Sequence, residues 1–296
     1  MEFLLTGGEG FIGRNLKEAL VSDNHTVMTL DTEGNPDYKV SILNLRALQR
    51  AFKGVDRVFH FAARTSPPQF EFDLLQGFKT NVIGTLNVLK AAADNGVKRV
   101  VLASSSATYG SMVSPGKEDM PIYGHDNMYA TTKLFDEYLG RYYTIRNELE
   151  VISLRLFNTY GIGENSKGLY SSVISKFLEA VLHKEDPVIY DEGKQSRDFI
   201  YVKDVATASI AAMQNGIPGE NYNVGTGHTY SFNEIIKEIS EALNVKIIPK
   251  YAKNPFKNYQ MFTQADIGKS FRDLNWKPQY DLKKGIVEIA EAIGLL

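Results

Sequence analysis

The sequence contains no cysteine among its 296 residues. This absence excludes disulfide bonds, thiolate nucleophiles and metal sites built on cysteine, and we expect no metal. An excess of charge of either sign is also missing, because 33 basic residues stand against 35 acidic ones. The resulting net charge of -2 gives no electrostatic reason to expect a nucleic acid or a membrane surface as partner.

Long apolar runs are lacking as well. No uninterrupted apolar stretch is long enough to span a bilayer, and the first residues do not follow the order of a signal peptide. We therefore expect a cytoplasmic protein. Hydrophobic residues make up 43% of the chain, which suffices for a large core in one large domain or in two unequal ones.

Short β-rich runs alternate with amphipathic segments of helical length through the first half of the chain. Strands that are apolar throughout and are joined by helices indicate a parallel sheet covered on both faces. The sequence therefore predicts an α/β fold of the Rossmann type, with a doubly wound parallel sheet. The predicted strands are 3–5, 26–30, 58–61, 99–103 and 151–154. A first predicted helix ends near residue 20, and two longer ones cover about 73–95 and 127–146.

The alternation loosens after about residue 160, where glycine, proline and aromatic residues become more frequent. We predict a Rossmann domain at 1–160, completed by elements from about 188–215, and a smaller mixed α/β lobe at 161–296. Asp204 is expected to cap the free amides of a helix at 205–213. Further predictions for this half are loops at 161–168 and 252–260, a helix at 232–243 and a strand at 246–248.

A glycine loop joins the first predicted strand to the first predicted helix. Gly7, Gly10 and Gly13 are spaced three apart, as needed for a tight bend, a close approach of backbone to a pyrophosphate, and close packing of helix on strand. The start of the helix, at Phe11 and Ile12, directs free N–H groups towards the same anion. The pattern predicts a dinucleotide site, the alternative being an ordinary structural turn.

Asp31 lies at the end of the second predicted strand. A carboxylate there accepts hydrogen bonds from both ribose hydroxyls of an adenosine and repels a 2′-phosphate. We therefore expect NAD rather than NADP, the alternative being a surface aspartate.

Tyr129 and Lys133 are four residues apart and share one face of a predicted helix. Such a pair alone is most often solvated surface, but a serine-rich loop at 103–110 follows a predicted central strand at the sheet edge where ligands bind. A lysine ammonium and a positive nicotinamide would both favour the phenolate. Tyr129 could then take a hydroxyl proton while hydride leaves the same carbon.

The sequence resembles the extended short-chain dehydrogenases/reductases of the NAD-dependent nucleotide-sugar epimerase/dehydratase family. The resemblance extends in family order over nearly the whole chain. It is carried by segments 6–13, 59–63, 81–85, 103–110, 129–133, 155–161, 197–205, 223–227 and 274–278.

This resemblance implies roles for individual residues. The catalytic residues would be Ser105, Tyr129 and Lys133. The residues that bind NAD would be Gly7, Gly10, Phe11, Ile12, Gly13, Asp31, Ser41, Ile42, Phe61, Ala62, Ala63, Asn81 and Ser104, together with Tyr129 and Lys133. The residues that bind the nucleotide-diphosphate sugar would be Ser106, Asn158, Arg197 and Lys257.

For Arg197 the resemblance implies a contact with the diphosphate, and a guanidinium pairs well with phosphate oxygens. The alternative is an ion pair with a nearby acid such as Asp198.

Some positions depart from the family pattern. Glu9 brings a negative charge into the glycine loop and should weaken cofactor binding unless it points to solvent. Ser41 and Ile42 stand where many relatives place an acid that holds the adenine amine. A second diphosphate arginine is not evident, and Lys257 or Lys253 occupies its region. We interpret His60 as structural.

The two residues after Ser105 narrow the choice of reaction. A 4,6-dehydratase of this family has an acidic pair there, whereas this chain has Ser106 and Ala107. We therefore predict a UDP-sugar 4-epimerase that forms a transient 4-keto sugar. Segments 103–110, 134–138 and 259–266 also resemble ADP-heptose 6-epimerases. A 4-dehydrogenase, a 4-ketosugar reductase and a non-catalytic NAD-binding regulator remain as alternatives.

The family also implies a homodimer formed through two long helices of each subunit. Segments 73–95 and 127–146 carry apolar residues on more than one face. Packing within one subunit would explain that pattern equally well.

Overall fold

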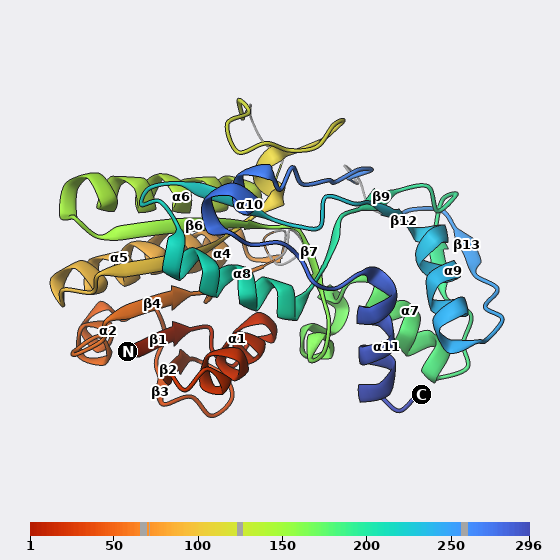
Figure 1. Cartoon of the computed structure of the whole chain (residues 1–296), viewed down its shortest axis with the longest axis horizontal. Helices are drawn as coiled ribbons and strands as arrows, with labels where there is room; N and C mark the ends of the chain where they lie inside the picture. Colours follow the sequence, from red (N-terminus) through yellow and green to blue (C-terminus); the bar gives the residue numbers. More distant parts are fainter. Residues whose placement is uncertain (66–69, 71, 123–126, 256–259) are drawn as a thin grey trace.

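The computed structural model describes the chain except for residues 66–69, 71, 123–126 and 256–259 and the side chains of residues 166 and 169. Its largest element is a seven-stranded sheet in the order β11-β6-β5-β4-β1-β2-β3, in which all neighbouring strands are parallel (Figure 1). This sheet confirms the predicted Rossmann-type α/β fold. The strands are β1 (Glu2–Thr6), β2 (Thr26–Asp31), β3 (Tyr38–Lys39), β4 (Arg57–His60), β5 (Arg99–Ser105), β6 (Glu150–Leu156) and β11 (Asn221–Val224).

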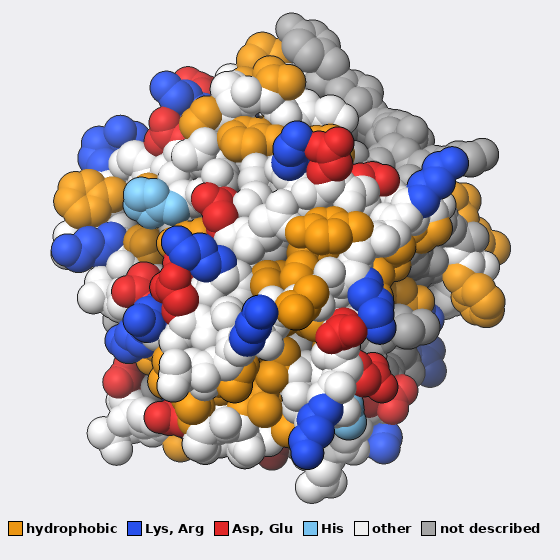
Figure 2. All heavy atoms as spheres, turned by 90° about the vertical axis from the view of Figure 1, so that its right-hand side faces the viewer, with side chains coloured by type: hydrophobic (Ala, Val, Ile, Leu, Met, Phe, Trp, Pro, Cys, Tyr) orange, Lys and Arg blue, Asp and Glu red, His pale blue; other side chains and the backbone are white. Residues whose placement is uncertain are grey.

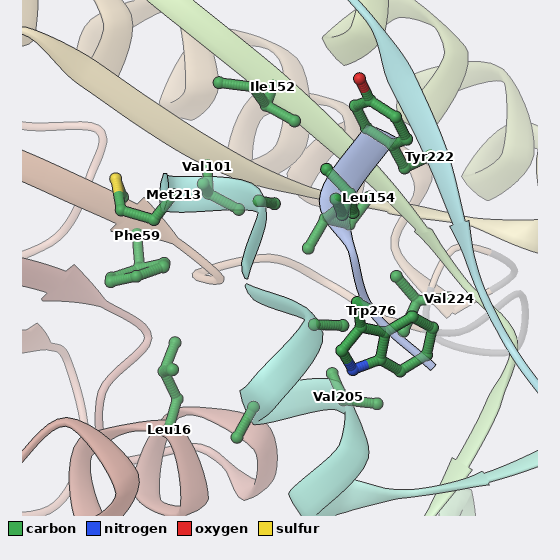
Figure 3. Packing of buried hydrophobic residues seen from close by; sticks show 14 of the residues in the cluster. Leu16, Phe59, Val101, Ile152, Leu154, Val205, Met213, Tyr222, Val224 and Trp276 are labelled. Carbon is green, nitrogen blue, oxygen red and sulfur yellow. The ribbon is translucent and has the colours of Figure 1, made fainter. Parts of the chain in front are cut away.

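Helices cover both faces of the sheet because successive side chains of a strand point to opposite sides. In β1, Leu5 packs in one core with helices α1 and α8, whereas Leu4 packs in a second core with α2 and α5. Figure 3 shows the first core, where Leu16 lies near Phe59 and where Trp276 packs beside Val205. The helices named here are α1 (Phe11–Ser22), α2 (Leu45–Ala51), α5 (Gly84–Asp94) and α8 (Val202–Asn215), and α6 (Met128–Asn147) also lies on the second face.

The helical segment predicted at 73–95 is interrupted. It consists of α4 (Leu74–Phe78), a π-helical turn η1 (Lys79–Ile83) and α5. Such π turns insert into α-helices frequently at functional sites. The turn buries Asn81 completely.

The remaining elements form a smaller lobe with its own core beside the sheet (Figure 1). Helices α7 (Val173–Leu182), α9 (Phe232–Leu243) and α11 (Leu282–Ala292) supply most of that core. Figure 2 shows the end of the molecule formed by this lobe, where acidic and basic side chains are interspersed. Its short strands pair as β7 (Asn158–Tyr160) with β10 (Phe199–Tyr201), β9 (Ser196–Arg197) with β12 (Tyr230–Ser231), and β8 (Val188–Tyr190) with β13 (Lys250–Ala252).

Several local predictions for this half of the chain are wrong. Segment 246–248 is not a strand, and the strand in this region is β13. The loop predicted at 161–168 is largely the 3₁₀ helix η3 (Glu164–Tyr170). Asp204 lies inside the first turn of α8, and its carboxylate accepts from the distant backbone amides of Gln279 and Tyr280, both at 2.9 Å.

The large sheet also takes its last strand from further along the chain than expected. Helix α8, within 188–215, packs in the core beneath the sheet as expected. Strand β11, however, lies beyond residue 215, whereas β8 pairs only in the smaller lobe. In the described part of the chain, no helix combines the length and the apolar character needed to cross a membrane.

Leu16 provides a test of the core beneath the sheet. Its side chain is completely buried in α1, so Leu16→Ala should lower the free energy of unfolding by about 3 kcal/mol, measured by urea denaturation. Glu18→Ala, on the exposed side of the same helix, should change it by less than about 0.5 kcal/mol. Equal effects of the two changes would contradict this packing.

Candidate active site

A cavity of about 1790 Å³ lies where the large sheet meets the smaller lobe. The carboxyl ends of parallel strands open at this edge, which is where open α/β sheets bind their ligands. The cavity is lined by most of the residues that the sequence singled out. They are Gly7, Gly10, Phe11, Ile12, Gly13, Asp31, Ser41, Ile42, Phe61, Ala62, Ala63, Ser104, Ser105, Ser106, Tyr129, Lys133, Asn158 and Arg197.

The glycine loop has the shape that a dinucleotide pyrophosphate requires. Gly7 has a φ of +74°, and a Cβ there would lie 2.6 Å from the backbone nitrogen of Ala62. A Cβ at Gly13 would overlap the carbonyl oxygen of Gly7. Only glycine fits at both positions, as the tight bend and the close packing of α1 require. Gly10, Phe11 and Ile12 at the start of α1 line the cavity, where the free N–H groups of a helix start favour an anion.

Asp31 is held at the cavity wall by backbone amides. Its carboxylate accepts from the amide of Glu9 at 3.0 Å and from the amide of Thr32 at 2.7 Å. The Glu9 side chain lies against Gly34, with its carboxylate 3.9 Å from the guanidinium of Arg14, and it does not line the cavity. Its negative charge is therefore directed away from the pyrophosphate position. The loop and Asp31 together fit NAD.

Helix α6 presents Tyr129 and Lys133 to the cavity. Asn127 caps the helix by accepting from the backbone amide of Ala130 at 2.9 Å. Tyr129 and Lys133 are both buried, and the lysine Nζ donates to the carbonyl oxygen of Ala103 at 2.9 Å. This bond ties the helix to the carboxyl end of β5.

Ser105 ends β5 and begins a 3₁₀ turn, η2 (Ser106–Tyr109). Its Oγ accepts from the backbone amide of Ala107 at 3.1 Å, which holds the hydroxyl at the cavity. The structure therefore brings Ser105, Tyr129 and Lys133 to one cavity, while their catalytic roles stay a prediction.

The neighbouring Ser104 directs its hydroxyl elsewhere. Its Oγ donates to the carboxylate of Glu137 at 2.5 Å, and the same carboxylate forms a buried ion pair with Arg155 at 2.8 Å. Ser104 lines the cavity and its hydroxyl belongs to this buried network, while its contact with NAD stays a prediction.

Asn81, predicted to bind NAD, does not line the cavity. Its side chain accepts from the backbone amide of Arg64 at 2.8 Å and donates to the Arg64 carbonyl at 3.0 Å and to the Thr132 hydroxyl at 3.1 Å. Asn81 lies in the π turn η1 and its side chain is completely buried, which explains why it does not line the cavity. Asn81 joins the loop after β4 to α6 and supports the wall from behind.

His60 lies in the interior between two threonines. Its Nδ1 is 2.6 Å from the hydroxyl of Thr6 and its Nε2 is 3.0 Å from the hydroxyl of Thr85. Burial, with a smaller contribution from the charge of Lys133, lowers the pKa of His60 to about 3. This neutral, enclosed imidazole agrees with the structural interpretation.

The substrate side of the cavity contains Asn158 and Arg197. The amide of Asn158 donates to the hydroxyl of Thr263 at 2.9 Å, and the guanidinium of Arg197 donates to the carbonyls of Ser196, at 2.9 Å, and Gln260. Lys257 lies outside the described residues.

Asp198, the alternative partner of Arg197, forms other bonds. Its carboxylate accepts from the backbone amides of Thr226 at 2.8 Å, Gly227 at 2.9 Å and Ala265 at 3.0 Å. These backbone amides and the hydroxyl of Thr226, which donates at 2.7 Å, surround this buried carboxylate.

Three cationic side chains at the cavity were not foreseen from the sequence: Arg64, Lys167 and Lys176. Lys167 lies 4.4 Å from the centre of the Phe11 ring and 3.4 Å from the carboxylate of Glu164. Its approach to the glycine loop depends on how the two lobes meet. Local sequence therefore carries no signal for it.

A family model described as the NAD dependent epimerase/dehydratase family matches residues 3–225. A UDP-N-acetyl-alpha-D-glucosaminuronate decarboxylase of Bacillus cytotoxicus is 35% identical over 80% of this chain and 79% of that protein. A putative UDP-glucose 4-epimerase of Methanocaldococcus jannaschii is 32% identical over 97% and 96% of the two chains. The crystal structure of UDP-glucose 4-epimerase from Thermotoga maritima with UDP-glucose superposes with a TM-score of 0.92, at 28% identity over 98% of each chain.

The chain therefore belongs to the NAD-dependent epimerase/dehydratase family. It is an enzyme of the nucleotide-sugar branch of the extended short-chain dehydrogenases/reductases, and NAD is its cofactor. The family and the cofactor expected from the sequence are both confirmed.

Asp31→Asn tests the cofactor preference. Loss of the carboxylate should weaken NAD binding about tenfold and reduce the preference for NAD over NADP, because a hydrogen bond to a charged group is lost and a 2′-phosphate is no longer repelled. Isothermal titration calorimetry with both dinucleotides measures this. Glu9→Gln is the control and should leave the preference unchanged, whereas an unaltered preference in Asp31→Asn would contradict the assignment.

Proposed function

We propose that the protein is a UDP-sugar 4-epimerase that interconverts UDP-glucose and UDP-galactose, or their N-acetyl forms, through a transient 4-keto sugar. The observation that carries the proposal is the single cavity that joins the glycine loop, the catalytic candidates on β5 and α6, and Arg197. A reversible oxidation at one carbon needs these three parts side by side.

Each side chain has a defined task in this reaction. The phenolate of Tyr129 takes the proton of the sugar 4-hydroxyl, and the hydroxyl of Ser105 donates a hydrogen bond to that oxygen. Lys133 favours the phenolate by its positive charge. NAD supplies the chemistry of accepting a hydride from the sugar and giving it back. On return, Tyr129 gives the proton back to the oxygen.

Inversion requires the keto sugar to present its other face while the nucleotide stays bound. Arg197 lines the cavity away from α6, at β9, and its guanidinium suits a diphosphate. Fixing the diphosphate there leaves the sugar free to turn. The serine and alanine after Ser105 provide no acid for an elimination, which argues against dehydration.

Decarboxylation of a UDP-uronate is a second candidate, favoured by the similarity to the Bacillus decarboxylase. A ketone at C4 of a uronate lies β to the carboxylate, so the same first oxidation would lead to loss of carbon dioxide. A one-way 4-dehydrogenase would start from the same hydride transfer, and a 4-ketosugar reductase would run that transfer in reverse. ADP-heptose 6-epimerisation would apply the same oxidation and return at another carbon.

A substrate panel separates these reactions. The purified protein is incubated without added NAD with UDP-glucose, UDP-N-acetylglucosamine, UDP-glucuronate and ADP-heptose, and the products are followed by NMR. We expect UDP-galactose or UDP-N-acetylgalactosamine at unchanged redox state. A pentose product from UDP-glucuronate would favour the decarboxylase, and turnover only with stoichiometric NAD would favour a dehydrogenase or reductase.

Tyr129→Phe tests the acid/base role. Removing one hydroxyl should lower kcat by about 10²- to 10⁴-fold while NAD binding and the melting temperature change little. Tyr251→Phe, an exposed tyrosine on β13 outside the cavity lining, is the matched control and should retain full activity. Retention of most of the rate in Tyr129→Phe would instead favour a non-catalytic NAD-binding regulator.

We also propose a homodimer formed through α6 and the α4–α5 segment. Phe135, Tyr138, Tyr142 and Ile145 are exposed on α6 at intervals of three, four and three residues, which places them along one face of the helix. An exposed apolar stripe of this kind is typical of an interaction surface. Leu74, Leu75 and Phe78 on α4 are exposed too.

Ile145→Glu should therefore shift the protein towards the monomer, because a carboxylate would be buried in the interface without a partner. Light scattering coupled to gel filtration measures the mass. Lys237→Glu on α9, exposed in the other lobe, is the control and should leave the mass unchanged. A monomeric wild-type protein at micromolar concentration would contradict the homodimer.

A further inference from the structure

Asp136 is a buried acid for which the proposed reaction has no use. It lies on α6 one turn after Lys133, and its side chain has no exposed surface. One carboxylate oxygen is 3.4 Å from Nζ of Lys133. The other, Oδ1, is buried with no hydrogen-bond partner among the described residues. A buried acid with one unsatisfied oxygen is costly for stability, so its presence calls for an explanation.

The adjacent Glu137 shows what a structural acid looks like in the same helix. Its carboxylate bonds to the guanidinium of Arg155 at 2.8 and 2.9 Å, to the hydroxyl of Ser104 at 2.5 Å and to the amide of Asn221 at 2.9 Å. Asp136 lacks such a set of partners, and the charge that it faces is that of Lys133.

The groups that bear on the charge of Asp136 are Lys133 and Glu137 on the same helix and the hydroxyl of Thr85 on α5. Burial raises the pKa of Asp136 to about 7, against the lowering effects of Lys133 on α6 and Thr85 on α5, and Glu137 raises it slightly further. His60 on β4, which faces Lys133 and Thr85, is uncharged near neutral pH. The charge of Glu137 is compensated by Arg155. Asp136 is therefore the group of this cluster whose charge changes near neutral pH.

We propose that Asp136 is a positioning residue whose carboxylate holds Lys133 and offsets the positive charge that the lysine presents to the phenol of Tyr129. This inference rests on the proposed roles of Tyr129 and Lys133. When Asp136 is ionised, part of the ammonium charge is neutralised and the phenolate is favoured less. When Asp136 takes up a proton from solvent, the full charge acts on Tyr129 and the phenolate is favoured more.

The test is a spectroscopic titration of the phenol in the NAD complex. The ultraviolet difference between each protein and its Tyr129→Phe counterpart isolates one phenolate among the 16 tyrosines. Asp136→Asn keeps the size and a hydrogen-bonding oxygen but removes the charge. We expect the midpoint of the titration to move to lower pH by about half a unit to one unit.

A matched control is Asp204→Asn, which alters another buried aspartate on a helix. The Asp204 carboxylate bonds to the amides of Gln279 and Tyr280, outside the cavity lining, so the midpoint should not move. An unchanged midpoint in Asp136→Asn, or a shift to higher pH, would overturn the proposal, even if the melting temperature falls.

A second variant at the same position provides an independent test of the role of Asp136. Asp136→Ala should give the same downward shift and also weaken NAD binding, since Lys133 keeps its bond to the carbonyl oxygen of Ala103 but loses the carboxylate.

These readouts need no sugar substrate. If the midpoint shifts as expected but the substrate panel shows no 4-epimerisation, the proposed reaction fails and the role of Asp136 stands. If epimerisation is found and the midpoint does not move, the proposed reaction stands and the role of Asp136 fails.

Discussion

The site depends on one hydrogen bond, from Nζ of Lys133 to the carbonyl oxygen of Ala103 at 2.9 Å. It joins helix α6 to the carboxyl end of β5 inside the protein, where water does not compete. Tyr129 lies one turn before the lysine on the helix, and Ser105 lies two residues beyond the carbonyl on the strand. This bond, together with the bond from Ser104 to Glu137 that joins the same two elements, sets how the phenol and the serine hydroxyl lie relative to each other.

Buried polar groups fix the surroundings of this bond. Glu137 and Arg155 join α6 to β6, and Ser104 connects the same carboxylate to β5. In the smaller lobe, the carboxylate of Asp198 accepts hydrogen bonds from the backbone amides of residues 226, 227 and 265. Buried ionic groups of this kind add little net stability, but they disfavour arrangements in which a charge would lose its partners. They position the strand ends from which the cavity is built.

Local patterns in the sequence predicted the parts of the fold that depend on neighbouring residues. The apolar strands, the glycine loop and the four-residue spacing of Tyr129 and Lys133 are of this kind, and so are the cavity residues near them. One failure involves distant partners. Asp204 binds amides 75 and 76 residues away, so the cap expected from its position near a helix start does not form.

Side-chain direction was the other limit of the sequence. The family resemblance puts Asn81 and Ser104 close to the cavity. The side chain of Asn81 in the π turn is buried against Thr132, and the hydroxyl of Ser104 donates to Glu137. Neither effect leaves a periodic signal in the sequence. Lys167 is similar, because its contact with Phe11 arises only when the two lobes meet.

The central claim is that the phenol of residue 129 and the hydroxyl of residue 105 act on one sugar oxygen. A crystal structure of the protein with NAD and UDP-galactose tests it most directly. The account predicts that both side-chain oxygens lie within about 3 Å of O4 of the sugar. A complex in which the two groups contact different atoms, or in which the sugar lies outside the cavity, would contradict it.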